Sequence, residues 1–426
     1  MTRAHLVALI VGAAMVAAAC RGVVATPPER GYDGRAHVEY VEILRGGGRL
    51  PTERETYEYS TPPAYPWLAV QAQRVADAVG VLPNWRAGQA LSVLWLVGEL
   101  AVAFALAREL APGRPWLAAA AVAATAAVPI VLRLGVMLHP ESQAAALLGL
   151  ALFLFVRASR RGWPLAAAAA IGVVLGLAAV TRQTAAIVIV AVAAVALCAR
   201  AFRFAAVAAV ALAVVAGPWW GYQGVRYGNP LESNLNRPGY VLHGGLPRSY
   251  YVSAPIRALV VHPYRPRFAN QLLPQFYADL WSDWFGGQHD AWEHPSHGAR
   301  IFASMQSVTA FPLTVFAIGA VFGLGVHALR RVVGGRAREI DAALSVFLVV
   351  VVASWIAFFV QVTRFPQVGG DPIKSSYMLY LAPVFAVGAV LAGARLWECG
   401  RAWRFALAGA AALYAASYVG FVVTSY

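Results

Sequence analysis

The sequence predicts an all-α polytopic membrane protein, a single domain over residues 1–426 with about eleven transmembrane helices. Hydrophobic residues make up 60% of the chain and charged residues only 13%, whereas soluble domains carry about 25% charged residues. Apolar stretches of about 20 residues, the length that crosses a bilayer, recur near 4–24, 87–107, 116–133, 141–157, 164–181, 184–200, 203–220, 306–329, 341–361, 377–395 and 404–424.

The arginines predict the orientation of these segments. Short loops rich in basic residues stay in the cytoplasm, and arginines follow every even-numbered segment, as Arg108, Arg157 and Arg330 illustrate. The N-terminus is therefore expected in the cytoplasm and the C-terminus outside, in a multi-pass protein of the plasma membrane. The first segment is interpreted as a signal anchor, although a lipoprotein-like box precedes Cys20.

The net charge of +14 is explained by the same arginines. A basic cytoplasmic surface suits an anionic leaflet, so no nucleic-acid partner is expected. The three cysteines form no disulfide framework. The arginine- and alanine-rich composition with a single lysine is typical of a GC-rich bacterium.

The first extracytoplasmic loop, residues 21–86, gathers acids, a histidine and aromatic residues beside a membrane span. A short helix is expected from Gly34 to Arg45, because Asp33 occupies an N-cap position and three glycines follow. Asp33, His37 and Tyr40 have i, i+4, i+7 spacing and share one face. On another face Val38, Val41 and Leu44 are expected to rest on the membrane surface.

The rest of the outer face is expected to consist of short surface elements. The run Pro62-Pro63 with Pro66 predicts an extended segment, followed by a second surface helix over 67–79. A larger loop, residues 221–305, is aromatic and acidic, and we expect short helices there that roof a cavity.

In four short motifs and in its topology, the chain resembles the glycosyltransferase C superfamily, in the branch of protein mannosyltransferases and aminoarabinose transferases. The resemblance is carried by the acidic motif at Asp33, the Pro-Pro-aromatic run, the sequence His139-Pro140-Glu141 at an outer helix start, and Lys374 with Tyr377 before a late span. It implies an enzyme that takes a sugar from a polyprenyl-phosphate donor and places it on a glycan, lipid or protein acceptor outside the cell. An inverting mechanism is expected.

The resemblance assigns roles to particular residues. Asp33 is expected to be the general base, because a hydroxyl acceptor needs a base near the anomeric carbon. The family's Asp-Glu pair is Asp33-Gly34 here, so Glu39 or Glu58 is expected to replace the second acid. Glu141 is expected to face Asp33 in catalysis. Further substrate-binding candidates are His37, Tyr40, Glu58, His139, Arg182, Arg364, Lys374 and Tyr377.

Two of these cations are candidates for the donor phosphate. Lys374 is the only lysine of the chain, and Arg182 lies in an outer turn, against the cytoplasmic bias of arginines. Guanidinium groups match phosphate oxygens well, and Arg364 is an alternative. Simpler interpretations remain beside these: Asp33 as a helix cap, Glu141 at a helix dipole, Arg182 as a snorkelling side chain, and Lys374 paired with Asp371.

The sequence does not assign a role to several other polar residues, and it leaves alternative functions open. Asp279 and Asp283 share a helical face that suits either an acceptor sugar or the membrane surface, and Glu99 lies within a span. The histidines of 288–297 do not predict a zinc site, and the sequence does not decide whether a divalent metal takes part. Alternative functions are a lipid or oligosaccharide transporter or flippase, a related ligase or acyltransferase, and a non-catalytic scaffold.

Overall fold

The structure, a computed structural model, describes residues 2–80, 82–234, 247–253, 271–282, 297–365 and 373–425. All regular secondary structure in these ranges is helical. The first half contains α1 (Arg3–Ala25), α2 (Gly34–Gly47), α3 (Ala64–Val79), α4 (Asn84–Leu110), α5 (Pro115–Ala126), α6 (Pro129–Gly135), α7 (Glu141–Ser159), α8 (Leu165–Ala179), α9 (Ala185–Cys198) and α10 (Phe202–Tyr227). The second half contains α11 (Arg248–Val252), α13 (Leu272–Trp281), α14 (His297–Val333), α15 (Asp341–Arg364), the 3-10 helix η4 (Ser375–Leu381), α16 (Ala382–Cys399) and α17 (Arg401–Ser425).

The predicted polytopic architecture is confirmed. Within the described residues, 8 helices are long and apolar enough to cross a membrane, and a bent pair raises this number to 9. The predicted segments near 164–181 and 184–200 correspond to α8 and α9, which are apolar but shorter. Each of the eleven predicted segments thus coincides with a helix or with a helix pair.

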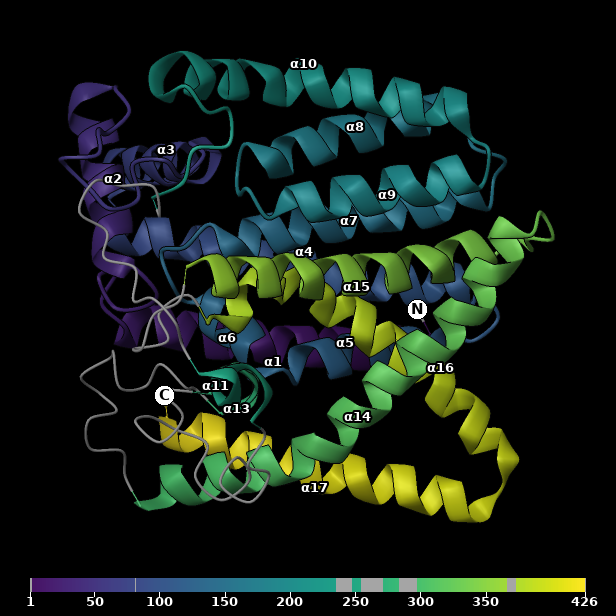
Figure 1. Cartoon of the computed structure of the whole chain (residues 1–426). Coiled ribbons are helices and arrows are strands. Elements are labelled where there is room, and N and C mark those ends of the chain that lie inside the picture. The colour runs from purple at the N-terminus through teal and green to yellow at the C-terminus, as the bar shows by residue number, and fades with distance from the viewer. Residues whose placement is uncertain are drawn as a thin grey trace.

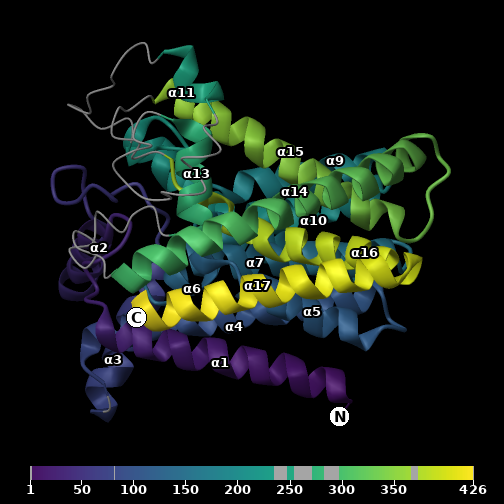
Figure 2. The ribbon, with the colours of Figure 1, turned by 90° about the horizontal axis from the view of Figure 1, so that it is seen from below.

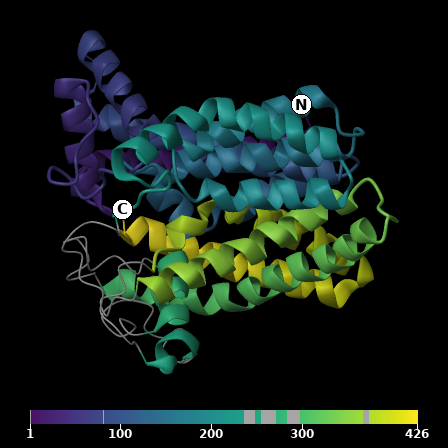
Figure 3. The ribbon, with the colours of Figure 1, turned by 45° about the horizontal axis from the view of Figure 1, so that its top comes forward.

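The helices run roughly side by side and give the molecule two distinct ends (Figure 1). One end carries α2, α3, α11, α13 and the C-terminus, whereas the N-terminus lies at the other. The turns that follow α4, α7, α9, α14 and α16, which hold the arginines of the sequence prediction, also lie at the N-terminal end. Helices α1–α10 form one side of the bundle and α14–α17 the other (Figure 3), with α1 along one edge in the view from below (Figure 2).

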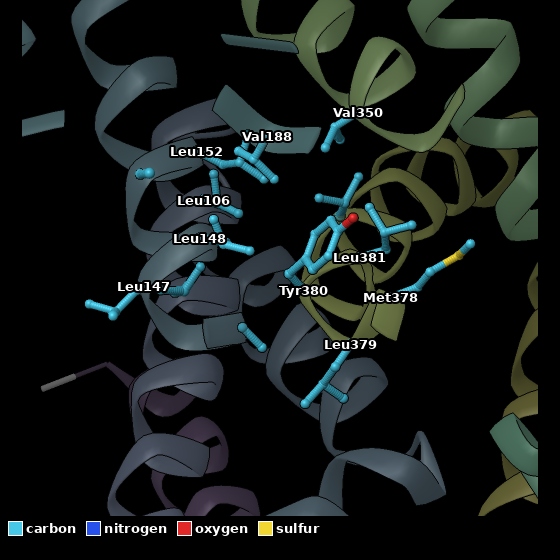
Figure 4. Close-up of a cluster of buried hydrophobic side chains, with 14 of the residues drawn as sticks. Leu106, Leu147, Leu148, Leu152, Val188, Val350, Met378, Leu379, Tyr380 and Leu381 are labelled. Carbon is cyan, nitrogen blue, oxygen red and sulfur yellow. The ribbon is translucent and has the colours of Figure 1, made fainter. Parts of the chain in front are cut away.

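The core lies where the two sides meet. Helix α7 is the most buried of the spanning helices described, with 72% of its 18-residue apolar stretch inside the protein. Leu148 and Leu152 of α7 pack in a cluster with residues of α9, α15 and η4, including Val188, Val350 and Leu381 (Figure 4). The hydroxyl of Tyr380 reaches Ser354 on α15 at 2.8 Å. The apolar packing therefore fixes η4, which begins at Ser375, against the first half of the chain.

The third predicted span is not one straight helix. It breaks into α5 and α6, which are bent by 71°. Pro129 is the first residue of α6, and its missing N–H ends the hydrogen-bond ladder of the preceding helix. The last two turns are thereby redirected, and they carry Arg133 into the buried interior at the C-terminal end of the bundle.

The first outer loop is more compact than predicted. Helix α2 begins at Gly34 as expected and ends at Gly47, and the next residue, Gly48, caps it with a left-handed backbone and a φ of 61°. The prediction that Val38, Val41 and Leu44 rest on the membrane surface is wrong, because all three are buried in a small core with α3. A hydrophobic face of α2 is satisfied by a neighbouring helix rather than by lipid.

Two predicted boundaries are also wrong. Helix α3 begins at Ala64 rather than at 67, so that Pro66 lies in its first turn instead of an extended segment. Proline is tolerated there because the N–H groups of the first turn have no intrahelical partner. The larger outer loop is shorter than 221–305, since α10 continues to Tyr227 and α14 begins at His297.

Candidate active site

The first feature of the site is an ion pair between Asp33 and Lys374, 341 positions apart in the sequence. Asp33 immediately precedes α2, but its side chain does not cap that helix. Its backbone is left-handed, with φ of 51°, a conformation that Asp and Asn tolerate better than most residues. The carboxylate instead accepts a hydrogen bond from the Lys374 ammonium.

Both members of this pair are withdrawn from water, Lys374 more than Asp33, with side-chain exposures of 7% and 25%. Burial would raise the pKa of Asp33, but the charge and the hydrogen bond of Lys374 hold that pKa below its ordinary value. Burial would lower the pKa of Lys374, and the Asp33 charge raises it above its ordinary value. The pair is therefore a carboxylate and an ammonium.

A second ion cluster is built around Arg182, in the turn between α8 and α9. Its Nε donates to Glu141 Oε1 at 2.7 Å, and its Nη1 lies 3.4 Å from Glu58 Oε2. The side chains of Glu141 and Glu58 are only 2% and 1% exposed. Buried carboxylates need such partners, because an unpaired charge in the interior is costly.

Glu58 is held by further donors from two loops. Its Oε2 accepts a hydrogen bond from the hydroxyl of Thr61, and its Oε1 lies 3.3 Å from the amide nitrogen of Asn234. Burial would lower the pKa of Arg182, but the charges of Glu141 and Glu58 raise it above its ordinary value. Arg182 is thus a permanent cation tying the first outer loop to the start of α7.

The two ion clusters are adjacent. The guanidinium of Arg182 lies 5.9 Å from the ring centre of Tyr377, and Tyr377 follows Lys374 by three residues in η4. The Arg182 charge also contributes to the lowered pKa of Asp33. The structure therefore brings together Asp33, Glu58, Glu141, Arg182, Lys374 and Tyr377 from five separate stretches of sequence.

Two histidines lie beside the ion clusters. The rings of His37 and His139 meet edge to face, with centroids 4.6 Å apart, and each residue is 2% exposed. Burial lowers the pKa of His37, although the charge of Glu58 opposes this. Burial also lowers the pKa of His139 well below its usual value, and the nearby charges of Arg182 and Lys374 act in the same direction. His139 Nδ1 accepts the backbone N–H of Glu141 at 3.3 Å, so this imidazole orients the start of α7.

Two predicted binding residues lie apart from the charged groups. Tyr40 is fully buried, and its hydroxyl donates to the carbonyl of Thr61 at 3.2 Å. This contact supports the loop that carries Glu58. Arg364 is exposed at the end of α15, where its guanidinium lies 5.6 Å from the ring centre of the adjacent Phe365.

The sequence prediction missed a third buried ion group at the same end of the molecule. Asp279 of α13 is 0% exposed and pairs with Arg133 of α6 at 3.2 Å. The hydroxyl of Tyr32, next to Asp33, donates to the same carboxylate and accepts from Arg133 at 2.8 Å. The predicted alternative of a helix on the membrane surface is wrong for Asp279, because its side chain is buried, whereas contact with an acceptor sugar stays a prediction.

Several predicted residues lie outside the described part of the chain. Asp283, Asp371 and all of the 288–297 stretch except His297 belong to this group. Glu99 is described, and it is fully buried within α4.

The carboxylates and histidines present do not fit a metal ion. Asp33 is engaged by Lys374, and Glu58 and Glu141 are engaged by Arg182. In the described ranges no three His, Cys, Asp or Glu side chains are grouped so that they hold a metal. No step of the proposed reaction is therefore assigned to a metal.

A large apolar cavity lies directly beside the site. Its volume is about 1740 Å³, and it is lined by α1, α5, α13, α14, α16 and α17. Ser375, the neighbour of Lys374, lines it at one end, and Arg114 and Glu398 line it at the other. Between these ends the lining is aliphatic and aromatic, with Phe276, Phe385 and Tyr418 among the side chains.

Comparison with solved structures confirms the fold that the sequence predicts. The oligosaccharyltransferase of Archaeoglobus fulgidus in its apo form superposes with a TM-score of 0.56 over 98% of this chain, at 15% sequence identity. ArnT, the aminoarabinose transferase of Cupriavidus metallidurans, bound to undecaprenyl phosphate, covers 91% of this chain with a TM-score of 0.47 and 16% identity. Both are membrane glycosyltransferases of the glycosyltransferase C superfamily.

The likeness is one of fold and not of full length. The chain spans 56% of the oligosaccharyltransferase and 60% of ArnT. No protein-family model matches the sequence, and no curated protein matches it significantly.

Proposed function

We propose that this chain, which shares its fold with membrane glycosyltransferases of the glycosyltransferase C superfamily, transfers a sugar from a polyprenyl-phosphate donor to an acceptor hydroxyl with inversion. The observation that carries the proposal is the Asp33–Lys374 pair, which joins a candidate base to a candidate phosphate-binding cation beside an apolar cavity. We place this site on the extracytoplasmic face, because the arginine-rich turns lie at the opposite end of the bundle.

The cavity supports a lipid donor. A polyprenyl chain between α13, α14, α16 and α17 would bury its methylene groups against apolar side chains, at about 0.8 kcal/mol for each methylene. A phosphate at the Ser375 end of the cavity would meet the ammonium of the adjacent Lys374. The donor is thus recognised by two unlike surfaces, one apolar and one cationic.

Donor binding changes the partner of Lys374. In the absence of substrate the ammonium is neutralised by Asp33. A donor phosphate carries at least one negative charge and competes for the same ammonium, which releases the Asp33 carboxylate to accept a proton. The base is therefore available only once the leaving group is in place.

The chemical step follows from this geometry. The acceptor hydroxyl oxygen attacks the anomeric carbon, and its proton passes to the carboxylate of Asp33. The bond between the anomeric carbon and the phosphate oxygen breaks, and the oxygen leaves with the electron pair as polyprenyl phosphate. Lys374 stabilises the charge that develops on this oxygen, where preorganised electrostatics contribute most. A single displacement inverts the anomeric configuration.

The remaining charged residues shape the sugar site. Arg182 fixes Glu141 and Glu58 at its rim, and Glu141 would accept a hydrogen bond from a sugar hydroxyl opposite Asp33. His139 orients the start of α7 through the N–H of Glu141. The ion pairs of this cluster stand at one end of the bundle, as a transferase acting at one membrane face requires, rather than in a series across the membrane as a transporter would need.

Replacement of Asp33 by Asn tests the proposal. Asn tolerates the left-handed backbone of this position, so the change removes the base without straining α2. Transfer should fall by about 10²–10⁴-fold, the contribution of a general base. The assay incubates purified protein with polyprenyl-phosphate sugars and measures release of the free carrier.

Glu39→Gln is the matched control. Glu39 was one of the two candidates for the second acid, but among the described residues its half-exposed carboxylate pairs with Arg35, whereas Glu58 joins the ion cluster at Arg182. This variant should keep wild-type activity. Full transfer by Asp33→Asn, with a natural donor and acceptor pair, would refute the assignment.

A further inference from the structure

A single carboxylate, that of Asp279, accepts four hydrogen bonds at the base of the site. Its Oδ1 accepts from the hydroxyl of Tyr32 at 2.5 Å and from Arg133 at 3.2 Å. Its Oδ2 accepts from the backbone N–H and the hydroxyl of Ser375, at 2.6 and 2.7 Å. Together these four contacts use the acceptor positions of both carboxylate oxygens.

These hydrogen bonds involve both chain segments that carry the Asp33–Lys374 pair. Tyr32 directly precedes Asp33, and Ser375 directly follows Lys374. The ammonium of Lys374 also lies 5.7 Å from the centre of the Tyr32 ring. Asp279 therefore holds the two segments together at the residues next to the Asp33–Lys374 pair, without touching either member in the contacts described.

Asp279, Tyr32, Arg133 and Ser375, which we call the Asp279 clamp, are buried, and the charge of Arg133 balances that of Asp279. Tyr32 and Asp279 are fully buried, and Ser375 and Arg133 are 1% and 3% exposed. Charge-assisted hydrogen bonds in such an environment are strong and directional, whereas removal of one partner leaves an uncompensated charge. Small displacements of Asp279 are thus transmitted to both neighbours rather than absorbed by water.

The helix that carries Asp279 also lines the apolar cavity. Leu273, Phe276, Tyr277, Leu280 and Trp281 of α13 all contribute to the cavity wall. Ser375, which Asp279 holds, lines it as well. One helix of ten residues therefore meets the cavity with its apolar side chains and the catalytic segments with its carboxylate.

We propose that Asp279 is a positioning residue that sets the spacing of Asp33 and Lys374, and that α13 couples filling of the cavity by a lipid chain to that spacing. This inference rests on the proposed function, but the experiments that test it do not require sugar transfer. A lipid chain packed against α13 steadies the helix and tightens the clamp. Donors with a complete chain are then turned over faster than truncated ones, because misplacement of a catalytic group by about 1 Å can cost about 10²-fold in rate.

The sole lysine of the chain provides a readout that needs no catalysis. Amine-reactive acylation of the purified chain in lipid nanodiscs modifies Lys374 and the N-terminal amine, which mass spectrometry distinguishes because they lie in different peptides. The ammonium of Lys374 is buried and paired, so its labelling is slow in the wild type. Asp279→Asn should accelerate labelling of Lys374 by about tenfold, the change expected from loss of roughly one charge-assisted hydrogen bond.

Two further variants keep this test decisive. Ser375→Ala removes one of the four hydrogen bonds with little change in volume, and it should accelerate labelling to a smaller degree even if Asp279→Asn folds poorly. Asp341→Asn is the matched control, because it removes a buried carboxylate that pairs with Arg331 at the opposite end of the bundle. Unchanged labelling in both Asp279→Asn and Ser375→Ala would overturn the positioning role.

The coupling is tested with a polyprenol that carries no phosphate. In the wild type it should slow the labelling of Lys374 several-fold, and in Asp279→Asn it should have no effect. An equal effect in both proteins would mean direct shielding and would overturn the coupling, as would the absence of any effect in the wild type. These outcomes do not depend on sugar transfer, so they are separate from a failure of the Asp33→Asn test.

Discussion

Asp33 and Lys374 set each other's protonation, and this mutual dependence is the main residue-scale property of the site. Burial alone would raise the pKa of Asp33 and lower that of Lys374, so burial disfavours the charged form of each residue. Together they remain ionised, with the pKa of Asp33 below its usual range and that of Lys374 above it. The free protein thus keeps Asp33, the proposed base, deprotonated under ordinary conditions.

Lys374→Met should therefore shift the acid limb of the pH profile. Burial acts to raise the pKa of Asp33, and Lys374 is the main group that opposes it. Without Lys374 the carboxyl binds a proton at higher pH, so the acid limb of kcat/KM should move to higher pH. Arg364→Met, which removes an exposed cation, serves as control. An unmoved acid limb in Lys374→Met would show that Asp33 is not the group that titrates.

The two buried histidines should make the folded state sensitive to acid. Their pKa values are lowered in the folded protein, whereas an unfolded chain binds protons at about pH 6.5. Unfolding therefore takes up protons as the pH falls below about 6.5, and stability declines with it.

His139→Asn should flatten this decline. The measurement is the melting temperature in detergent between about pH 7.5 and pH 5, a range that spans the ordinary pKa of histidine. His327→Asn, at an exposed position of α14, should leave the slope unchanged. A slope equal to that of the wild type in His139→Asn would contradict a buried neutral imidazole at this position.

Some residues of the site were predictable from the sequence alone and others were not. Asp33 and Lys374 stood out because a lone lysine and an acid both flank apolar segments on the predicted outer side, and the structure joins them. Arg133 carries the same signal as Arg182, an arginine at an outer segment end. Arg133 was not selected from the sequence because it ends an apolar segment that was predicted to be one straight span. The bend that turns this residue into the interior depends on tertiary packing. Asp279 was obscured by the amphipathic pattern around it.

At the scale of elements, helix α2 owes its position to a close backbone contact. A Cβ atom added at Gly34 would lie 2.5 Å from the carbonyl oxygen of Glu29, a distance that forces the backbone to move. Glycine here lets the preceding turn pack against the start of α2. Since Asp33 lies in that turn, the contact fixes where the carboxylate points.

Gly34→Ala should lower transfer by about tenfold or more, because a displacement of about 1 Å at a catalytic group is costly. The helical content by circular dichroism should stay unchanged. Gly46→Ala is the control in the same helix, since nothing lies within 4 Å of the added atom, and it should be neutral or stabilise by up to about 1 kcal/mol. Equal activity of the two variants would argue against this contact.

The elements themselves were mostly predictable, because hydropathy reports burial in lipid directly. The failures are at α3, where Pro66 was assigned to an extended segment, and at α2, whose apolar face was assigned to the membrane. Both errors share one cause. Sequence periodicity shows that a helix has an apolar face, but it does not show whether lipid or another helix covers it.

At the scale of the whole molecule, the cavity lies between distant parts of the chain. Helix α1 from the start of the sequence and α17 from its end both line it, together with α5, α13, α14 and α16. The sequence does not reveal such a space, because its lining residues come from helices that are far apart in the chain. Ser375, Arg114 and Glu398 are among the few polar side chains that line it.

Ala389→Trp should obstruct this cavity, which Ala389 lines from α16. The KM for a long-chain donor should rise by about tenfold or more, since two displaced methylenes are worth about 1.6 kcal/mol. The KM for a donor with a one- or two-isoprene chain should change little. Val210→Trp, at a position of α10 that is 65% exposed, should have no effect. A uniform rise for short and long donors would show that the cavity does not hold the chain.

The break between α5 and α6 ties the biogenesis of the site to the last spanning helix. The carbonyls of Ala126 and Ala127 at the break accept hydrogen bonds from Tyr418 and Tyr414 of α17. In hydrocarbon an unpaired carbonyl costs several kcal/mol, so the bend that delivers Arg133 is stable only after α17 has entered the bilayer. Tyr414 follows Ala127 by 287 positions, and while that length of chain is synthesised, a chaperone, lipid headgroups or water must hydrogen-bond the carbonyls at the break.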